Sequence, residues 1–327
     1  MHTLRSMLGV ARWAAVLTCL AGAATAALAQ EPFPNKPVRL LQGYAAGGPV
    51  DIVARILGDK LAEVWGKAVI VEARPGAVGA IAARDVARAA PDGYTLLIAP
   101  SNHVQTPFLA ANLPFDPLKD FTPIRLYADT PMLLVVNPAL PVRTLAEFVA
   151  QSRGGKITMA TSGTGSAPHL ASAQLAALAG TDFLYVPYNG VAPGRVAVMA
   201  GDVNAMFLAP PLAIPSIQEG KLRALAASGG RRWRDLPNLP TVAETGFPKY
   251  EASTWIGVMG PAKMAPDLVT RLDRDIKTAL QDPKVQQRIY GAGYDLLDAG
   301  AERFAEIVRA DYAKYGNLIT SLKITPQ

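Results

Sequence analysis

The stretch that decides the fold runs from Val38 to Trp65 and reads VRLLQGYAAGGPVDIVARILGDKLAEVW. The apolar run Val38 to Leu41 predicts a buried strand. A turn of small residues, Gly43 to Gly48, follows it, and Asp51 to Trp65 then carries apolar side chains at helical spacing. A strand, a tight turn and a helix in this order form the repeating unit of an α/β protein.

The same alternation continues along the rest of the chain. Further strand-like runs begin near Ala68, Thr95, Met132, Ile157, Phe183, Val203, Leu222 and Ala252. Helix-like stretches lie between them and after the last, at Pro266 to Gln281 and Ala301 to Leu322. The pattern predicts an α/β fold of two lobes, each a largely parallel sheet flanked by helices.

Two extended segments, Thr130 to Asn137 and Tyr250 to Gly260, are placed to cross between the lobes. The first domain is then discontinuous, with residues 30–131 and 254–327, and the second domain, residues 132–253, is inserted into it. Two crossing strands form a hinge.

The first 29 residues have the composition of a secretory signal peptide. Arg5 and Arg12 precede the apolar stretch Trp13 to Ala24, and Ala27 to Ala29 forms a small-residue cleavage site before Gln30. A membrane anchor is the alternative, but the stretch is short and rich in alanine. We therefore expect cleavage before Gln30 and an exported protein.

The only cysteine, Cys19, lies inside this predicted signal peptide. Lipidation of Cys19 is an alternative to cleavage, but Thr18 before it is bulkier than such processing prefers. If the segment is removed, the protein has no thiol, which excludes disulfides, a cysteine-ligated zinc and a cysteine nucleophile.

The charge of the chain is modest and spread out. The formal net charge of +6 falls to +4 without the signal peptide, because that segment carries two arginines and no acidic residue. We expect no nucleic-acid partner. Arg231, Arg232 and Arg234 lie in a stretch rich in proline and glycine, which favours a solvated surface loop over a polyanion site.

A search for catalytic motifs gives a negative result. Beyond the signal peptide the histidines are His103 and His169, with no acidic neighbours at metal-ligand spacing. The sequence from Gly163 to Ser166 fits neither a dinucleotide fingerprint nor a nucleophile elbow. Gly155-Lys156 is followed by Ile157, so it is no phosphate-binding loop of the Walker type. We expect a protein that is not an enzyme and has neither a metal nor a cofactor.

Two glycine-rich turns remain, one in each predicted lobe, and both follow a strand and open a helix. Their backbone N–H groups, together with the helix dipole, favour an anion such as a carboxylate. Taken alone, each turn reads first as an ordinary tight turn, but one in each lobe suits a ligand held between them. The residues are Tyr44, Ala45, Ala46, Gly47 and Gly48 in the first turn, and Ser162, Gly163, Thr164, Gly165 and Ser166 in the second.

Several distinctive motifs occur in one order along nearly the whole chain after the signal peptide. They are Ala45 to Arg55, Arg74 to Ala77, Ala89 to Leu97, Leu113 to Pro117, Ser162 to Leu170, Val186 to Gly190, Gly220 to Ala226 and Leu239 to Glu244. Together these motifs resemble one known family, the Bug (TctC) periplasmic solute receptors.

The resemblance implies a two-lobed periplasmic binding protein of the Venus flytrap type, which closes on a small carboxylate. It implies a location in the periplasm of a Gram-negative bacterium and, as partners, the permease subunits of a tripartite tricarboxylate transporter. We expect a monomer.

The resemblance also assigns roles to individual residues. In the family the two glycine-rich turns hold carboxylate groups, and residues matching Ser101 and Asn102 line the cleft, although these two could instead cap a helix. Tyr188 could offer a hydroxyl or a ring face. His169 is expected to be a structural donor rather than a base.

Departures from the family pattern bear on the ligand. Many relatives carry an aspartate at the position of Leu208, where it can pair with a ligand's amine. Val78, Ala80 and Ala82 replace smaller or polar residues and make that wall narrower and drier. We therefore expect a di- or monocarboxylate, aliphatic or aromatic, with an apolar body, rather than an amino acid.

Two other functions are alternatives. The protein could be the ligand-sensing receptor of a two-component system. It could also be a secreted serine hydrolase that uses Ser166 or Ser162, although the sequence positions no base for either serine.

Overall fold

The computed structural model describes residues 33–110, 112–155 and 157–324. The predicted signal peptide lies outside these residues. The chain divides at Lys36, and the fold described below is that of the second unit, Pro37–Gln327. No helix in the described part of the chain combines the length and the apolar character needed to cross a membrane.

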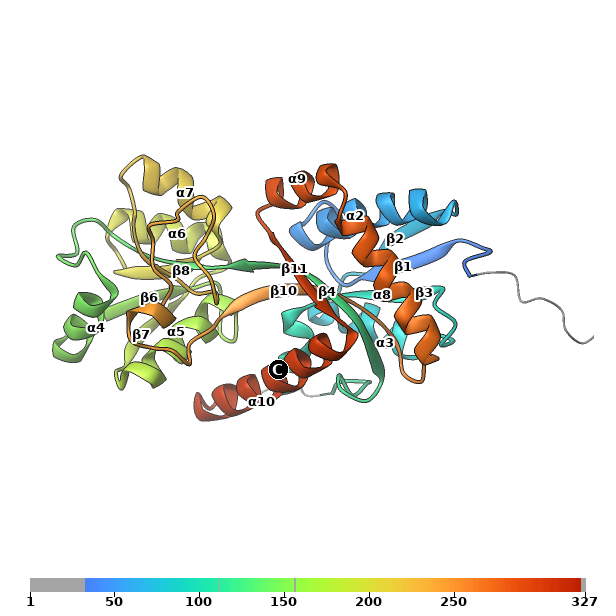
Figure 1. Ribbon diagram of the computed structural model, residues 1–327. Helices are drawn as coiled ribbons and strands as arrows, with labels where there is room; N and C mark the ends of the chain where they lie inside the picture. The colour runs from blue at the N-terminus through green and yellow to red at the C-terminus, as the bar shows by residue number, and fades with distance from the viewer. Residues whose placement is uncertain (1–32, 111, 156, 325–327) are drawn as a thin grey trace, which may run out of the picture. The chain divides into compact units, whose positions relative to one another are not determined.

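The first sheet has six strands in the order β11-β4-β10-β3-β1-β2 (Figure 1). β1 pairs in parallel with β2 and β3, whereas β10 is antiparallel to β3 and β4, and β11 is antiparallel to β4. The sheet is therefore mixed rather than largely parallel, because β10 returns from the second sheet and enters between β3 and β4. The strands are β1 (Val38–Gln42), β2 (Val69–Ala73), β3 (Thr95–Pro100), β4 (Phe121–Pro131), β10 (Ser253–Pro261) and β11 (Asp295–Gly300).

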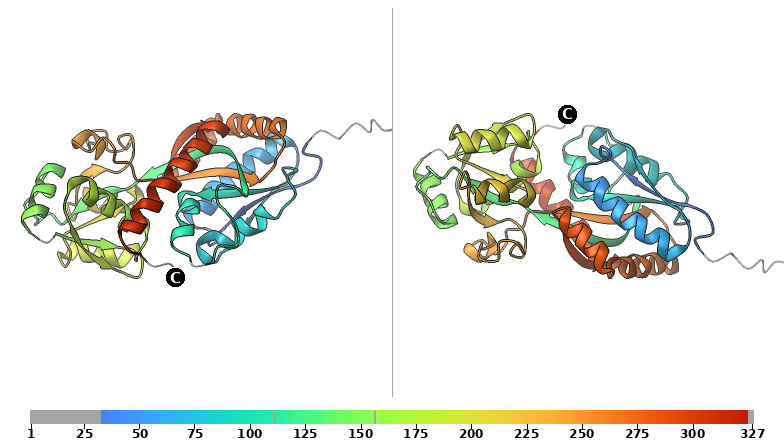
Figure 2. Two further views of the ribbon diagram at one scale, coloured as in Figure 1. Left: turned by 90° about the horizontal axis from the view of Figure 1, so that it is seen from below. Right: turned by 90° about the horizontal axis from the view of Figure 1, so that it is seen from above.

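Helices cover both faces of this sheet, as alternate residues of β1 show. Leu40 faces Gly58 of α2, and Leu41 belongs to the apolar cluster of α3 and α10. α2 also packs on α8 and α9, and α10 continues past the sheet to contact α5 (Figure 2). The helices are α2 (Pro49–Trp65), α3 (Ala80–Ala87), α8 (Pro266–Leu280), α9 (Pro283–Gly291) and α10 (Ala301–Ser321).

The second sheet has five strands in the order β7-β6-β8-β5-β9. It is mixed as well: β6 is parallel to β7 and β8, and β5 is antiparallel to β8 and β9. The strands are β5 (Leu133–Val136), β6 (Ile157–Thr161), β7 (Phe183–Pro187), β8 (Ala205–Leu208) and β9 (Arg223–Ala227).

The core of the second sheet also follows the alternation of its strands. Leu134 and Phe207 face α4 and α5, whereas Leu133 and Leu208 face α6 and α7. The helices are α4 (Leu145–Gly154), α5 (Ala167–Ala179), α6 (Val191–Ala200) and α7 (Pro210–Gln218). The predicted α/β fold with two sheets flanked by helices is confirmed.

The chain passes between the sheets at Met132, which separates β4 from β5, and again between β9 and β10. Ser228 ties these crossings together. Its Oγ accepts the N–H of Met132 at 2.7 Å and donates to the carbonyl of Ala252. The exact domain boundaries, residues 30–131 with 254–327 and residues 132–253, stay a prediction.

Candidate functional site

The first glycine-rich turn is held from within by two buried polar side chains. Gln42 at the end of β1 accepts the N–H of Tyr44 at 2.7 Å and donates to Asp51 at 3.0 Å. Asp51 accepts the N–H of Gly47 at 2.9 Å and is paired with Arg55 at 2.8 Å. Burial raises the pKa of Asp51, but the bonds from Arg55 and Gly47 outweigh it and keep that pKa below its ordinary value.

This arrangement changes what the first turn can offer to a ligand. The amides of Tyr44 and Gly47 already donate to side chains of the protein, and the N–H of Gly48 donates to the carbonyl of Ala45 at 3.1 Å. An internal carboxylate thus occupies part of the predicted cradle. The amides of Ala45 and Ala46 are the ones that remain for a guest.

The second turn is shaped by Gly163 and Gly165, whose φ angles of +119° and +76° favour glycine. The N–H of Gly165 donates to Nδ1 of His169 at 3.0 Å, and the N–H of Ser166 donates to the carbonyl of Gly163 at 3.2 Å. His169 is therefore an acceptor at Nδ1 rather than the expected donor. The amides of Gly163 and Thr164 are left for a ligand.

Ser166 stands at the start of α5 without capping it. Its Oγ is buried and has no hydrogen-bond partner among the described residues. Buried hydroxyl groups without a partner are uncommon in folded proteins, since each costs about 1–3 kcal/mol. The position at a helix N-terminus suits an anionic partner.

A third turn lies between β2 and α3 and carries Val78, which the sequence placed in a wall of the site. Gly76, Ala77, Val78 and Gly79 all have positive φ angles, of +131°, +46°, +54° and +92°. The carbonyl of Val78 accepts hydrogen bonds from Tyr44 Oη at 3.4 Å and Asn102 Nδ2 at 3.2 Å. The sequence identified this wall by the bulk of Val78 but did not predict its left-handed conformation, which β-branched residues avoid.

The three turns surround a cavity of about 580 Å³. Serine, threonine, asparagine, glutamine and tyrosine side chains line part of it, and alanine, valine, leucine, isoleucine and proline side chains line much of the rest. None of the described lining residues carries a formal charge. They are Tyr44, Val50, Ala77, Val78, Pro100, Ser101, Asn102, Gln105, Thr106, Leu109, Ala110, Thr164, Gly165, Ser166, Ala167, Thr254 and Ile324.

The cavity brings together six of the residues selected from the sequence: Tyr44, Ser101, Asn102, Thr164, Gly165 and Ser166. The others lie outside its lining. Ala45, Ala46, Gly47, Gly48, Ser162 and Gly163 form the remainder of their turns, and His169 lies behind the second turn.

Tyr188 and Leu208 are placed away from the cavity by their elements. Leu208 is 1% exposed on β8 and packs in the apolar cluster of α6 and α7, against which Tyr188 also packs. The role expected for Leu208 is therefore corrected. Its side chain lies on the face of the sheet that α6 and α7 cover, so it does not determine whether this cavity can bind an amine.

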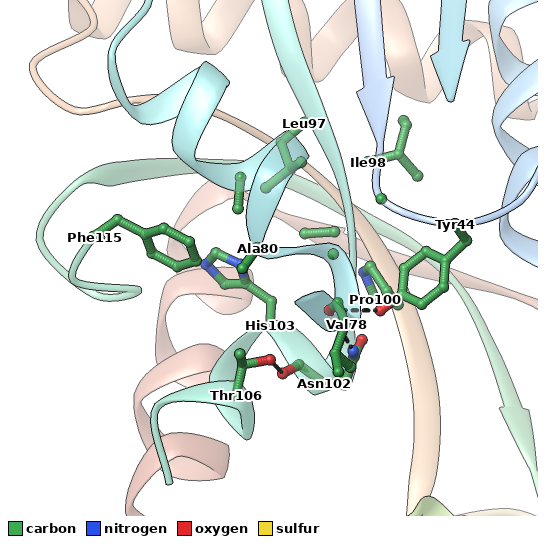
Figure 3. Close-up of a pocket in the computed structure, with 14 residues that line it drawn as sticks. Tyr44, Val78, Ala80, Leu97, Ile98, Pro100, Asn102, His103, Thr106 and Phe115 are labelled. Carbon is green, nitrogen blue, oxygen red and sulfur yellow. Dashed lines mark hydrogen bonds between the residues drawn. The ribbon is translucent and has the colours of Figure 1, made fainter. Parts of the chain in front are cut away.

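A smaller pocket, of about 20 Å³, lies behind the third turn, and Figure 3 shows its walls. It has room for a single water and not for a solute. The ring of His103 stacks on Phe115, with centroids 5.7 Å apart, and burial lowers the pKa of His103 to about 4. His103 is thus a neutral support of the wall that carries Asn102.

The described residues position no catalytic base at Ser166. Ser166 Oγ has no hydrogen-bond partner in the described chain, and Nδ1 of His169 is occupied by a backbone amide. Polar groups without a positioned base, in a cavity lined from several turns, define a binding site for a small solute.

Comparison with known proteins places this fold among the two-lobed periplasmic binding proteins. The model of the tripartite tricarboxylate transporter family receptor, TctC, matches residues 53–324. The chain belongs to this family, as its motifs predict. The family's solved members are periplasmic solute-binding proteins and not enzymes.

Individual relatives match over most of their length. Protein BugT of Bordetella pertussis is 33% identical over 272 residues, which are 82% of this chain and 83% of BugT. A TctC solute-binding protein from Polaromonas, solved without ligand, superposes with a TM-score of 0.83 at 26% identity, covering 88% of this chain and 99% of that one. Rpa4515 of R. palustris, solved with adipate, superposes with a TM-score of 0.72 at 29% identity. The match covers 90% of this chain and 100% of Rpa4515.

Proposed function

We propose that this receptor captures a small carboxylate with an apolar body, rather than an amino acid, in the 580 Å³ cavity. The observation that carries the proposal is the buried hydroxyl of Ser166 at the start of α5, which has no partner among the described residues, in a cavity whose described lining carries no charged side chain. The hydroxyl and the nearby free amides suit a carboxylate. An ammonium group would find no carboxylate among the described lining residues, so it would be buried unpaired.

The adipate bound to the R. palustris relative supports a carboxylate ligand, at 29% identity. For this chain we include monocarboxylates and aromatic acids, because apolar side chains make up much of the lining. Closure of the lobes about the Met132 and Ala252 crossings brings both walls onto one solute and is favoured by the bound ligand.

In the cell we assign the receptor to transport. Cleavage before Gln30 releases the chain into the periplasm of a Gram-negative bacterium, where the monomer delivers its solute to the permease subunits of a tripartite tricarboxylate transporter. Mass spectrometry of the periplasmic protein tests the cleavage, and light scattering tests the monomer. Loss of solute uptake in a strain lacking the receptor distinguishes transport from the sensing role.

The ligand class is tested by calorimetry with matched pairs of acids that differ by one ammonium group: adipate against 2-aminoadipate, and hexanoate against norleucine. We expect the unaminated acid of each pair to bind at least tenfold more tightly, since no lining residue pairs with an amine. Tighter binding of the amino acids would contradict the proposal. X-ray scattering should show compaction on binding, and an unchanged radius of gyration would contradict closure.

A further inference from the structure

Val78 occupies a backbone conformation that β-branched residues avoid. Its φ and ψ of +54° and +36° are left-handed, and Ala77 before it has a φ of +46°. Valine in this region is an outlier that persists only where the surroundings determine it. Such residues concentrate at binding and active sites, so the conformation directs attention to what the side chain contacts.

The surroundings hold this conformation from two sides. Tyr44, after β1, and Asn102, after β3, both donate to the carbonyl of Val78, as the dashed lines in Figure 3 show. The turn is also fixed by close backbone contact, because a Cβ on Gly43 would lie 2.3 Å from the Cα of Gly79. The neighbouring turns thus impose the left-handed conformation on Val78.

The consequence is an isopropyl group that faces the cavity instead of the core. Val78 is 63% exposed, more than any other large apolar residue in the described chain. It lines the cavity together with Val50, Leu109, Ala110 and Ile324. An apolar group held exposed at a conformational cost gains stability when an apolar partner covers it.

We propose that Val78 determines ligand selectivity by packing against the apolar body of the bound acid. The inference rests on the proposed function and deepens it. A ligand with an alkyl or aryl end covers Val78. A second carboxylate at this wall would lose water without gaining a cation, because the described lining residues include no cation. The cavity therefore favours a monocarboxylate over a dicarboxylate of the same chain length.

The test compares hexanoate with adipate, which have six carbons each and differ in whether one end is methyl or carboxylate. Calorimetry is done on the wild-type protein, on Val78→Thr, which keeps the branched shape and adds a hydroxyl, and on Val78→Gly, which removes the side chain and the strain. We expect the wild-type protein to prefer hexanoate, and both variants to reduce that preference about tenfold.

Lys263→Gly is the matched control, because Lys263 is also left-handed, with a φ of +64°, and does not line the cavity. Both glycine variants should raise the melting temperature, but Lys263→Gly should leave the hexanoate preference unchanged. If the wild-type protein binds hexanoate or adipate and the ratio of the two affinities is the same within twofold in both Val78 variants, the inference is wrong and the proposed function stands. If it binds none of the acids tested, the proposed function fails and the inference fails with it.

Discussion

Nδ1 of His169 accepts the backbone N–H of Gly165 across 3.0 Å, so the second turn is organised around a neutral imidazole. Burial lowers the pKa of His169, which keeps this nitrogen free to accept. The amide of Gly165, which the sequence predicted to bind a ligand, therefore donates to His169 instead. The neighbouring amides and the hydroxyl of Ser166 remain available to a ligand.

A pH dependence of stability follows from this bond. Because the pKa of His169 is lower in the folded protein than the ordinary value of 6.5, the unfolded chain takes up a proton first as the pH falls. Neutral His169 therefore makes its full contribution to the free energy of unfolding above pH 6.5, and this contribution is lost as the pH falls below 6.5. His169→Gln keeps an acceptor without titrating, so its unfolding free energy should fall less between pH 7 and pH 5 than that of the wild-type protein. Urea denaturation at both pH values measures this, and identical pH slopes would contradict it.

Ser166→Ala is expected to separate binding from stability. In the wild-type protein Ser166 Oγ has no partner among the described residues, so removing this hydroxyl should leave the unfolding free energy unchanged or slightly higher. Affinity for the carboxylate that binds should weaken by about 1 kcal/mol.

Ser172→Ala is the control for that experiment. Ser172 lies in the same helix, is fully buried and donates to the carbonyl of Pro168 at 2.7 Å. Its loss should cost about 1 kcal/mol of stability without changing affinity. Equal affinities for Ser166→Ala and the wild-type protein, measured by calorimetry, would remove Ser166 from the site.

Gly43→Ala should disturb the wall that the first and third turns share. The added Cβ would lie 2.3 Å from the Cα of Gly79, and backbone cannot move aside as a flexible side chain does. We expect a loss of about 1–3 kcal/mol in chemical denaturation. Gly154→Ala is the control, since its Cβ would meet nothing within 4 Å in helix α4, and its stability should be equal or higher. A Gly43→Ala protein as stable as the control would show that the turns do not depend on this contact.

The sequence predicted most strands from their apolar runs but missed two, for an identifiable reason. β4 contains Pro123, Arg125 and Asp129, and β11 contains Asp295 and Asp298. The charged residues among these interrupt the apolar pattern, and ion pairs with residues far along the chain hold them in the strands, such as Arg125 with Asp298 and Asp129 with Arg231. Long-range ion pairs leave no signal in local periodicity.

The site was predicted in part for a similar reason. Both glycine-rich turns contribute to the cavity, as their position between strand and helix indicates. That Asp51 and His169 would occupy some of their amides depends on side-chain packing that spacing does not reveal. The exposure of Val78 depends on hydrogen bonds from Tyr44 and Asn102, which come from two other turns.

The ion pair between Arg231 and Asp129 of the crossing strand β4 should stabilise the protein to an extent that depends on pH. Nη2 of Arg231 lies 2.7 Å from Asp129 and 3.5 Å from Asp295. Burial raises the pKa of Asp129 to about 6 although Arg231 opposes the rise, and Asp295 and Glu251 add to it. Because the folded pKa is above the ordinary 3.8, ionised Asp129 destabilises the protein above pH 6, and this cost disappears as the pH falls toward 3.8.

Replacing Arg231 should therefore lower the free energy of unfolding most at a pH where Asp129 is ionised. Arg231→Gln is expected to lose about 1–3 kcal/mol at pH 8, where it leaves a buried carboxylate without its partner, and less than about 1 kcal/mol at pH 5, where that carboxyl is largely protonated. Arg288→Gln is the control, because Arg288 pairs with Asp59 at 3.0 Å on the surface, and its loss should stay below about 0.5 kcal/mol at both pH values. Urea denaturation of the three proteins at pH 8 and pH 5 measures the difference. If Arg231→Gln lost the same stability at both pH values, the stabilisation by Arg231 would not depend on the charge of Asp129, and the prediction would be wrong.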